Sequence, residues 1–257
     1  MLLMETDSPL GPLRPWADHH DLLVRWYDHW LKGIDTGYMD EPPIRLLVKG
    51  KNVYRDEREW PLARTQWTKF YLGPQGSLAP VQPASDSSAS FQNDPDIPLT
   101  RAAPCLTYVT APFERETEVT GPVVLHLHAS LDREDATWVV VLRDIAPDGA
   151  SRVLTRGWLR ASHRETDPHK SRPWKPWHPH ARRLRVPPRE ICEYAIEVRE
   201  TSNAFLPGHR LALDVKGQDT LADDPIWVHE CNPLRTVHTI HCGPRHPSHL
   251  LLPVIPG

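Results

Sequence analysis

The sequence predicts a mainly β protein: an antiparallel jelly-roll β-sandwich preceded by one amphipathic helix. The 28 prolines and 13 glycines among 257 residues disfavour long helices. After residue 40, about ten short apolar or alternating segments follow one another without the helical crossovers that a parallel sheet needs. Only one segment, close to the N-terminus, has clear helical periodicity.

The composition argues against several classes of partner. The formal net charge is −3, so no excess of positive charge favours binding to nucleic acid. No apolar run of about 18 residues predicts a membrane span, and the first residues lack the basic and apolar regions of a signal peptide, so we expect a cytoplasmic protein. Four widely spaced cysteines form no Cys-x-x-Cys pair, which indicates reduced thiols: Cys105, Cys192, Cys231 and Cys242.

The first predicted element is a helix from about Asp18 to Leu31. Leu22, Trp26 and Trp30 recur at helical spacing and form a wide aromatic stripe. Gly33 follows at the position where a left-handed residue ends a helix. We expect this stripe to pack against a large apolar partner.

Strand patterns account for most of the remaining chain. Residues 123–129 alternate, which places Val123 and Leu125 on one face and His126 and His128 on the other. The Pro-Asp-Gly turn at 147–149 predicts a hairpin. The other strands are expected at 44–48, 66–72, 137–145, 153–159, 191–199, 211–215 and 249–255.

Two segments are predicted to be loops. Residues 74–98 are rich in Pro, Ser, Ala and Asp and have almost no apolar periodicity, which is typical of a linker or a surface excursion. Residues 164–188 carry six prolines, several basic residues and three histidines, and we expect them to cross an edge of the sandwich or the face of a neighbouring domain.

The chain has no motif for a nucleophile or a cofactor. A serine hydrolase of the α/β type presents its nucleophile in a Gly-x-Ser-x-Gly elbow, and neither this motif nor a cysteine equivalent occurs. Glycine-rich phosphate loops are absent as well. We therefore expect no cofactor and no complete catalytic site.

Fifteen histidines raise the question of a zinc site. The groups that lie close in sequence are His178 with His180, and His241, Cys242 and His246 with His249. No His-Glu-x-x-His motif occurs, and prolines interrupt the second group. We expect no bound metal and interpret these residues as loop histidines that hydrogen-bond to the backbone.

A series of motifs runs through the chain in one order. It includes Arg-Trp-Tyr-Asp-His-Trp-Leu-Lys-Gly at 25–33, Phe-Leu-Pro-Gly-His-Arg at 205–210, and further segments at 40–46, 55–57, 59–62, 118–122, 146–149, 201–203 and 247–249. In this order the motifs resemble the cocaine esterase and X-Pro dipeptidyl-peptidase family of serine hydrolases, often grouped with the NonD esterases. The resemblance covers nearly all of the chain from about residue 16 onward.

The resemblance implies a position within a larger enzyme. Family members have an N-terminal α/β-hydrolase domain with the nucleophilic serine and the acidic residue, an inserted helical cap, and a C-terminal jelly roll of the galactose-binding-like type. Residues 1–40 then correspond to the last strand and helix of the hydrolase domain, and residues 41–257 to the jelly roll. Because triad residues in such hydrolases follow the order Ser, Asp, His, this chain holds at most the histidine.

The resemblance leaves two candidates for that histidine. His19 and His20 follow Pro15 and Trp16, where family members have a Gly-Pro-Trp-Ser/Thr-His type of segment ahead of the helix. The aromatic helix suits an element that packs on a hydrolase sheet, so in this chain we expect it to pack on the sandwich, on a second copy or on a separate hydrolase polypeptide. The expected partner is therefore an α/β-hydrolase domain on a separate chain, or a second copy of this chain through the same helix face.

Three functional hypotheses remain open from the sequence. In the first, the chain belongs to this hydrolase family and is inactive alone because it lacks an activated nucleophile. The alternative is a stand-alone module that binds a carbohydrate or protein partner, with Trp138 and Trp158 as candidate contacts, although core packing suits both. The third is a gene fragment separated from its hydrolase half.

Overall fold

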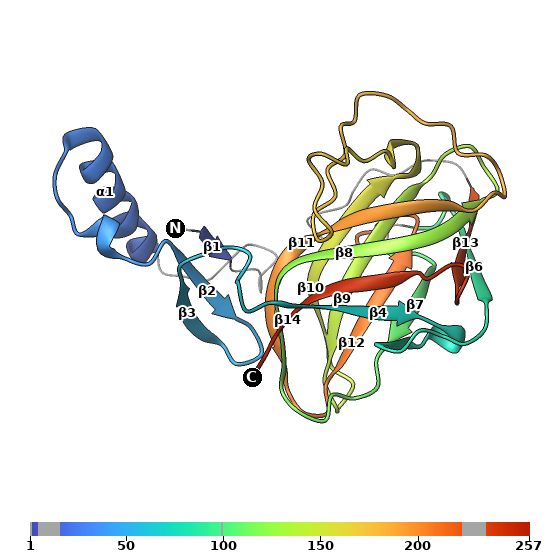
Figure 1. The fold of residues 1–257 in the computed structure, drawn as a ribbon, viewed down its shortest axis with the longest axis horizontal. Coiled ribbons are helices and arrows are strands. Elements are labelled where there is room, and N and C mark those ends of the chain that lie inside the picture. The colour runs from blue at the N-terminus through green and yellow to red at the C-terminus, as the bar shows by residue number, and fades with distance from the viewer. Residues whose placement is uncertain (1, 5–15, 99, 223–234) are drawn as a thin grey trace.

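A computed structural model of the chain describes residues 2–4, 16–98, 100–222 and 235–257, with side chains from residue 20 onward (Figure 1). The predicted mainly β, antiparallel architecture with a single N-terminal helix is confirmed. No helix in these ranges is long and apolar enough to cross a lipid bilayer.

The helix α1 (Trp16–Lys32) contains the predicted segment and extends slightly beyond it at both ends. Gly33 follows in the left-handed conformation, with a φ of 68°, and its N–H donates to the carbonyl of His29 at 3.1 Å. Figure 1 shows α1 projecting away from the sandwich, beside a small separate sheet. The short 3₁₀ helix η1 (Tyr38–Asp40) connects it to the rest of the chain.

The small sheet contains β1 (Leu2–Met4), β2 (Ile44–Val48) and β3 (Val53–Glu57). β2 pairs parallel to β1 and antiparallel to β3. The β2–β3 hairpin is anchored to the sandwich because Lys49 N–H donates to the carbonyl of Ser202 at 3.1 Å and Ala204 N–H donates to the carbonyl of Lys49 at 2.8 Å.

The main sheet has the strand order β5-β4-β14-β8-β11-β10-β9-β12-β7, and all of these neighbours are antiparallel. The strands are β4 (Gln66–Leu72), β5 (Leu78–Ala79), β7 (Cys105–Val109), β8 (Thr117–Leu131), β9 (Thr137–Ile145), β10 (Ser151–Arg160), β11 (Cys192–Phe205), β12 (Arg210–Lys216) and β14 (His249–Ile255). An isolated bridge between Ser77 and Val109 brings the two edges together, so that the sheet is nearly closed.

Two further strands extend this sheet beside β8. β13 (Thr236–Cys242) pairs with β8 on one side and with β6 (Ser87–Asn93) on the other. The remaining 3₁₀ helices are η2 (Pro74–Gly76) and η3 (Ala161–His163).

One hydrophobic core fills the interior of the sheet. The alternation predicted for 123–129 is confirmed, because Val123, Leu125 and Leu127 are at most 1% exposed while His126 and His128 lie half-buried on the outer face. Burying an aliphatic side chain contributes about 1.5–3 kcal/mol, whereas a buried imidazole must lose its hydration. This difference decides which face of β8 turns inward.

The interpretation of 74–98 as a loop was wrong. This segment contains η2, β5 and β6. β6 was not predicted from the sequence because it is an edge strand rich in serine. Phe91 and Asn93 are its only buried residues. An edge strand is stabilised by its backbone ladder and needs little apolar alternation.

The predicted strand at 123–129 was too short. β8 begins at Thr117 and continues through Gly121 and Pro122, two residue types that in a sequence usually indicate the end of a strand. Both neighbours of β8 shift register here, and Gly121 has a φ of 141°. The strand therefore continues through a β-bulge.

Residues 164–190, here called the strap, form a long excursion across the outer face of the sheet. Trp174 of the strap stacks on Trp67 of β4 with ring centroids 5.7 Å apart. His178 hydrogen-bonds to the carbonyls of Glu165 and Ala195, each at 2.9 Å. The strap is thus attached to β4 and β11 by side chains.

Candidate functional site

The helix α1 exposes most of its aromatic stripe. Trp26, Trp30 and Leu31 are 39%, 56% and 74% exposed. The rings of Trp26 and Trp30 lie 6.5 Å apart and contact each other rather than the sandwich. Since soluble proteins rarely leave contiguous apolar patches of this kind uncovered, the stripe is a candidate association surface.

The candidates for the family's histidine lie at the start of α1. His20 is exposed, and its Nδ1 lies 3.7 Å from Oδ1 of Asp21, also an exposed residue. Within the described residues no hydroxyl or thiol hydrogen-bonds to the His20 ring. The side chain of His19 lies outside the described residues.

Two partial catalytic arrangements occur elsewhere. Ser130 Oγ lies 3.1 Å from Nε2 of His241, and no acid hydrogen-bonds to that ring in the described ranges. Asp144 Oδ1 accepts a 2.7 Å hydrogen bond from Nδ1 of His209, but the nearby Ser151 hydroxyl is bonded to Arg143. A triad needs hydroxyl, imidazole and acid in one chain of hydrogen bonds, and these pairs lie apart.

The Asp144–His209 pair lies beside a polar cavity of about 260 Å³. Asn203 donates to Oδ2 of Asp144 at 3.4 Å and accepts from Arg152 at 2.8 Å. Gly50 and Asn52 of the β2–β3 turn also line it, so the cavity marks the joint between the small sheet and the sandwich. Its groups neutralise one another, which suits a structural joint.

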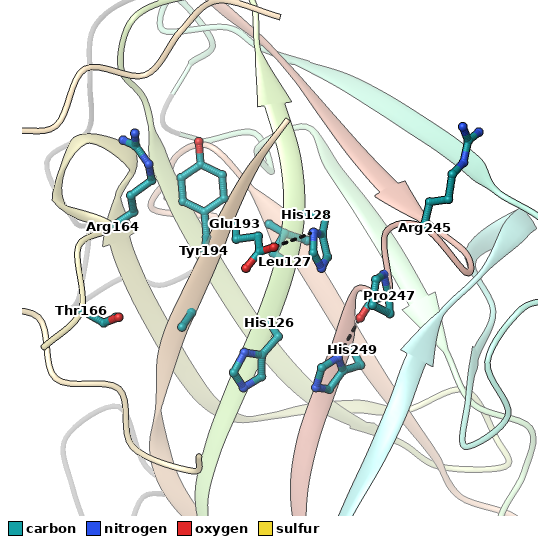
Figure 2. Close-up of a pocket in the computed structure, with 11 residues that line it drawn as sticks. His126, Leu127, His128, Arg164, Thr166, Glu193, Tyr194, Arg245, Pro247 and His249 are labelled. Atoms are coloured by element: carbon teal, nitrogen blue, oxygen red, sulfur yellow. Dashed lines mark hydrogen bonds and ion pairs between the residues drawn. The ribbon is translucent and has the colours of Figure 1, made fainter. Parts of the chain in front are cut away.

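A second and larger cluster lies on the outer face of the main sheet. It is called here the histidine ladder and consists of His126, His128, His241, His246 and His249. The register places His126 opposite His249 of β14 and His128 opposite His241 of β13. Figure 2 shows the rings of His126 and His249 side by side, and their centroids are 4.8 Å apart.

Burial and mutual repulsion keep four rings of this ladder uncharged. Burial above all, with smaller contributions from His126 and Lys69, lowers the pKa of His249 to about 4 against the opposing effect of the Pro247 carbonyl. The pKa values of His126, His128 and His241 are also lowered, chiefly by burial. At neutral pH these rings are therefore neutral imidazoles.

The structure brings together only part of the histidine and cysteine group that the sequence singled out at 241–249. The structure brings His241, His246 and His249 together but excludes Cys242, which points into the core, where burial raises its pKa to about 11. Across the described residues no three side chains of His, Cys, Asp or Glu are arranged to hold a metal ion.

His126 was missed as a site residue because only the strand register reveals it. The same holds for His128. The alternation of β8 showed in the sequence that both rings point outward, but not which strands lie beside them.

The other histidine pair and the remaining cysteines have local roles or none. His178 bonds to backbone carbonyls, as expected, while His180 lies beside it with ring centroids 5.8 Å apart. Cys105, Cys192 and Cys242 are free thiols, and Cys231 lies outside the described residues.

Neither tryptophan proposed for a binding module offers a free platform. Trp138 is fully buried against Tyr194 and His238 in the core. Trp158 is half-buried, donates from Nε1 to Asp219 at 3.0 Å and is covered by Arg199. Trp138 is thus excluded as a ligand contact. Neither of the two tryptophans supports the hypothesis of a stand-alone binding module.

The chain is similar to known proteins over most of its length. Residues 36–251 match the family described as the X-Pro dipeptidyl-peptidase C-terminal non-catalytic domain. A Mycobacterium bovis protein, classed by its name among the serine esterases, is 32% identical over 276 residues, which cover 97% of this chain and 43% of that protein. Cocaine esterase from a Rhodococcus species is 29% identical, over 90% of this chain and 45% of the enzyme.

Solved structures agree on the fold. A CocE/NonD family hydrolase from Staphylococcus aureus superposes with a TM-score of 0.81 at 23% identity, over 93% of this chain and 46% of that one. An aminopeptidase from a marine sediment Thaumarchaeota archaeon gives 0.73 at 20% identity, over 93% and 44%. The chain spans less than half the length of the relatives that it matches.

Proposed function

Because the chain belongs to the family of X-Pro dipeptidyl-peptidase C-terminal non-catalytic domains, we propose that it is the accessory jelly-roll unit of a serine hydrolase acting on esters or X-Pro peptides. In this function it binds an α/β-hydrolase domain and does not hydrolyse substrate by itself. The observation that carries the proposal is the exposed aromatic stripe of α1.

The contacts of α1 support a docking role. Within the described chain Arg25, in the middle of the helix, ties it to the segment that follows, because it pairs with Glu41 at 2.7 Å and donates to the carbonyl of Thr36 at 3.2 Å. Its apolar side chains gain little burial from the sandwich. Covering Trp26, Trp30 and Leu31 in an interface would remove this apolar surface from water, which favours association.

The partner that we propose is an α/β-hydrolase domain. The relatives are more than twice as long as the matched region, and two of them are named as esterases. We assign residues 1–40 to the hydrolase side of the interface and residues 41–257 to the jelly roll. His19 and His20 are then the positions at which this chain would contribute a histidine to the partner's site.

The chemistry of the described residues supports the absence of activity in the chain alone. Ser130 is 8% exposed and its imidazole partner has no acid, while Asp144 and His209 have no hydroxyl to activate. An isolated serine is a poor nucleophile at neutral pH because its hydroxyl stays protonated. The three cysteines among the described residues are free thiols, which fits a reducing compartment such as the cytoplasm, the location that we propose.

The test is reconstitution in trans. The purified 257-residue chain is assayed with p-nitrophenyl acetate and an X-Pro dipeptide anilide, alone and with the separately expressed N-terminal half of the Mycobacterium bovis relative. We expect no turnover by the chain alone and a 1:1 complex in size-exclusion chromatography. Serine-dependent turnover by the chain alone would overturn the proposal.

Variants locate the interface. Trp26→Ala combined with Trp30→Ala should weaken complex formation at least about ten-fold, as loss of central aromatic anchors does. The matched control is Trp177→Ala, an exposed tryptophan of the strap. Self-association of the chain through α1, without binding of the hydrolase half, would replace the proposed partner by a second copy.

A further inference from the structure

We propose that the cavity beside the histidine ladder is a binding site for a small dianionic oxyanion, occupied in mildly acidic conditions. The inference concerns the sandwich and is independent of the docking role of α1. It rests on the shape of the cavity, on ring nitrogens that lack partners, and on the charges that surround them.

The cavity has a volume of about 470 Å³ and lies between the strap and the turn from β13 to β14. His126, His128 and His249 line it, and Figure 2 shows Arg164 and Arg245 flanking them on opposite sides. A sulfate ion, a phosphate ester or a dicarboxylate fits in this volume, which is in the usual range of small-molecule sites.

Several polar groups at the cavity are unused. No residue of the described ranges hydrogen-bonds to the ring of His128, and its nearest charged neighbour, Glu193 Oε1, is 3.9 Å from Nδ1. His249 donates from Nδ1 to the carbonyl of Pro247 at 2.7 Å, which leaves Nε2 as the nitrogen that takes up a proton. The Thr166 hydroxyl also lines the cavity without a partner among the described residues.

The charges around the ladder are mostly positive once the imidazoles are protonated. The titratable groups that face it come from every neighbouring element: Lys69 and Tyr71 of β4, His126 and His128 of β8, Glu193 of β11, His241 of β13, Arg245, His246 and His249 of the turn and β14, and Arg164 of the strap.

The acidic groups cannot balance this charge. Glu193 is the acid that faces the rings, and its side chain is 85% exposed. Asp86 pairs with Arg245, so these two charges offset each other and leave Lys69, Arg164 and the protonated rings as the source of positive charge. Arg164 bonds to the carbonyls of Ala161, Leu184 and Arg185 and keeps its charge near the cavity.

Protonation and anion binding are therefore coupled. After burial, the charges of neighbouring histidines and of Lys69 are what lower the pKa values of His126 and His249. A bound dianion offsets both the lost hydration and this repulsion, so it raises the pKa values of the rings that it contacts. By linkage the anion binds more tightly as the pH falls.

The experiment is calorimetric titration of the 257-residue chain with sulfate and, separately, with malonate, in a zwitterionic buffer. Sulfate stays dianionic across the tested range, whereas malonate is partly monoprotonated near pH 5.5, so its affinity is referred to the concentration of the dianion. We expect at least about ten-fold tighter binding at about pH 5.5 than at about pH 7.5, because protonated imidazoles supply the charge. NMR titration of the imidazole resonances should show raised pKa values in the presence of the anion.

Two variants with opposite expected effects make the test specific. His128→Gln should weaken sulfate binding and reduce its pH dependence. Glu193→Gln, at a side chain too exposed to affect folding, should tighten binding several-fold because it removes the acid that faces the rings. The control is His169→Gln, an exposed histidine of the strap that does not line the cavity.

Each outcome bears on the proposal. Binding of sulfate alone assigns the site to tetrahedral anions, and binding of malonate alone assigns it to carboxylates. The proposal would be overturned if neither anion bound near pH 5.5, or if the affinity did not change with pH. It would also be overturned if Glu193→Gln left the affinity unchanged, or if His169→Gln weakened binding as much as His128→Gln.

Discussion

Asp144 on β9 accepts a 2.7 Å hydrogen bond from Nδ1 of His209, the residue that immediately precedes β12. The carboxylate is 5% exposed, and Asn203 also donates to it. In a hydrolase such a pair would orient an imidazole toward a nucleophile. Here it fastens a turn to the sheet, since no hydroxyl of the described residues bonds to the imidazole.

We expect Asp144→Ala to destabilise the fold by about 2–4 kcal/mol, because it leaves His209, Asn203 and Arg152 beside an unfilled polar site. Urea unfolding followed by far-UV circular dichroism measures this loss. The control is Asp56→Ala, whose ion pair with Arg45 is 46% exposed on both sides and should contribute less than about 1 kcal/mol. Equal losses in both variants would contradict a structural role for Asp144.

A glycine pair tests how the hairpin is anchored. Gly50 and Gly149 have similar φ values of 82° and 88°, but an added Cβ at Gly50 would lie 2.1 Å from the carbonyl oxygen of Ala204, whereas at Gly149 nothing lies within 4 Å. Gly149→Ala should lower the free energy of unfolding by about 1 kcal/mol, the usual penalty of an alanine in the left-handed conformation.

Gly50→Ala should lower the free energy of unfolding by at least about 3 kcal/mol, or release the β2–β3 hairpin from β11. The reason is that the Ala204 backbone cannot move aside as a flexible side chain can. Denaturant unfolding gives the difference, and hydrogen exchange at the Lys49 amide shows whether the anchor has opened. If both alanine variants lose the same stability, the close approach is not what requires glycine.

The unfolding free energy should fall as the pH drops from about 6.5 to about 4. His238 is 1% exposed between Phe91 and Trp138, and burial lowers its pKa to about 4. Because the unfolded chain takes up a proton near pH 6.5 and the folded chain does not, the stability contributed by the neutral ring is complete above that pH and is lost below it.

For His238 alone this loss is on the order of 2–3 kcal/mol. The lowered pKa values of His126, His128, His241 and His249 add to it in the same direction. His238→Gln should flatten the slope of unfolding free energy against pH, measured by denaturant titration at several pH values, while His169→Gln should leave it unchanged. An identical slope in His238→Gln would assign the pH dependence to other groups.

Two sets of tryptophan variants separate the helix from the core. Trp26→Ala with Trp30→Ala should change the unfolding free energy of the sandwich by less than about 0.5 kcal/mol, because the stripe is exposed. Trp138→Ala, at a fully buried ring, should cost about 3–5 kcal/mol. Thermal unfolding monitored by near-UV circular dichroism distinguishes them, and a large loss in the helix variant would show that α1 packs on the sandwich.

The expectations that local periodicity supports are the ones that the structure confirms. Strands 137–145 and 249–255 have their predicted bounds, and the alternation along β8 turns Leu125 inward and His126 outward. β6 and the continuation of β8 through Gly121 were missed, because an edge strand and a bulge are stabilised by their neighbours and leave little pattern of their own.

The sequence by itself determined the fold class, the family resemblance, the aromatic stripe of α1 and the absence of a nucleophile elbow. These are properties of consecutive residues, in which spacing along the chain is spacing in the structure. Strand register, decided only in the tertiary structure, set His126 opposite His249 and His128 opposite His241, brought Ser130 within 3.1 Å of the His241 ring, and kept these residues apart from Asp144 and His209. Antiparallel pairing joins residues more than 100 positions apart, and a shift of one residue would turn each ring to the opposite face.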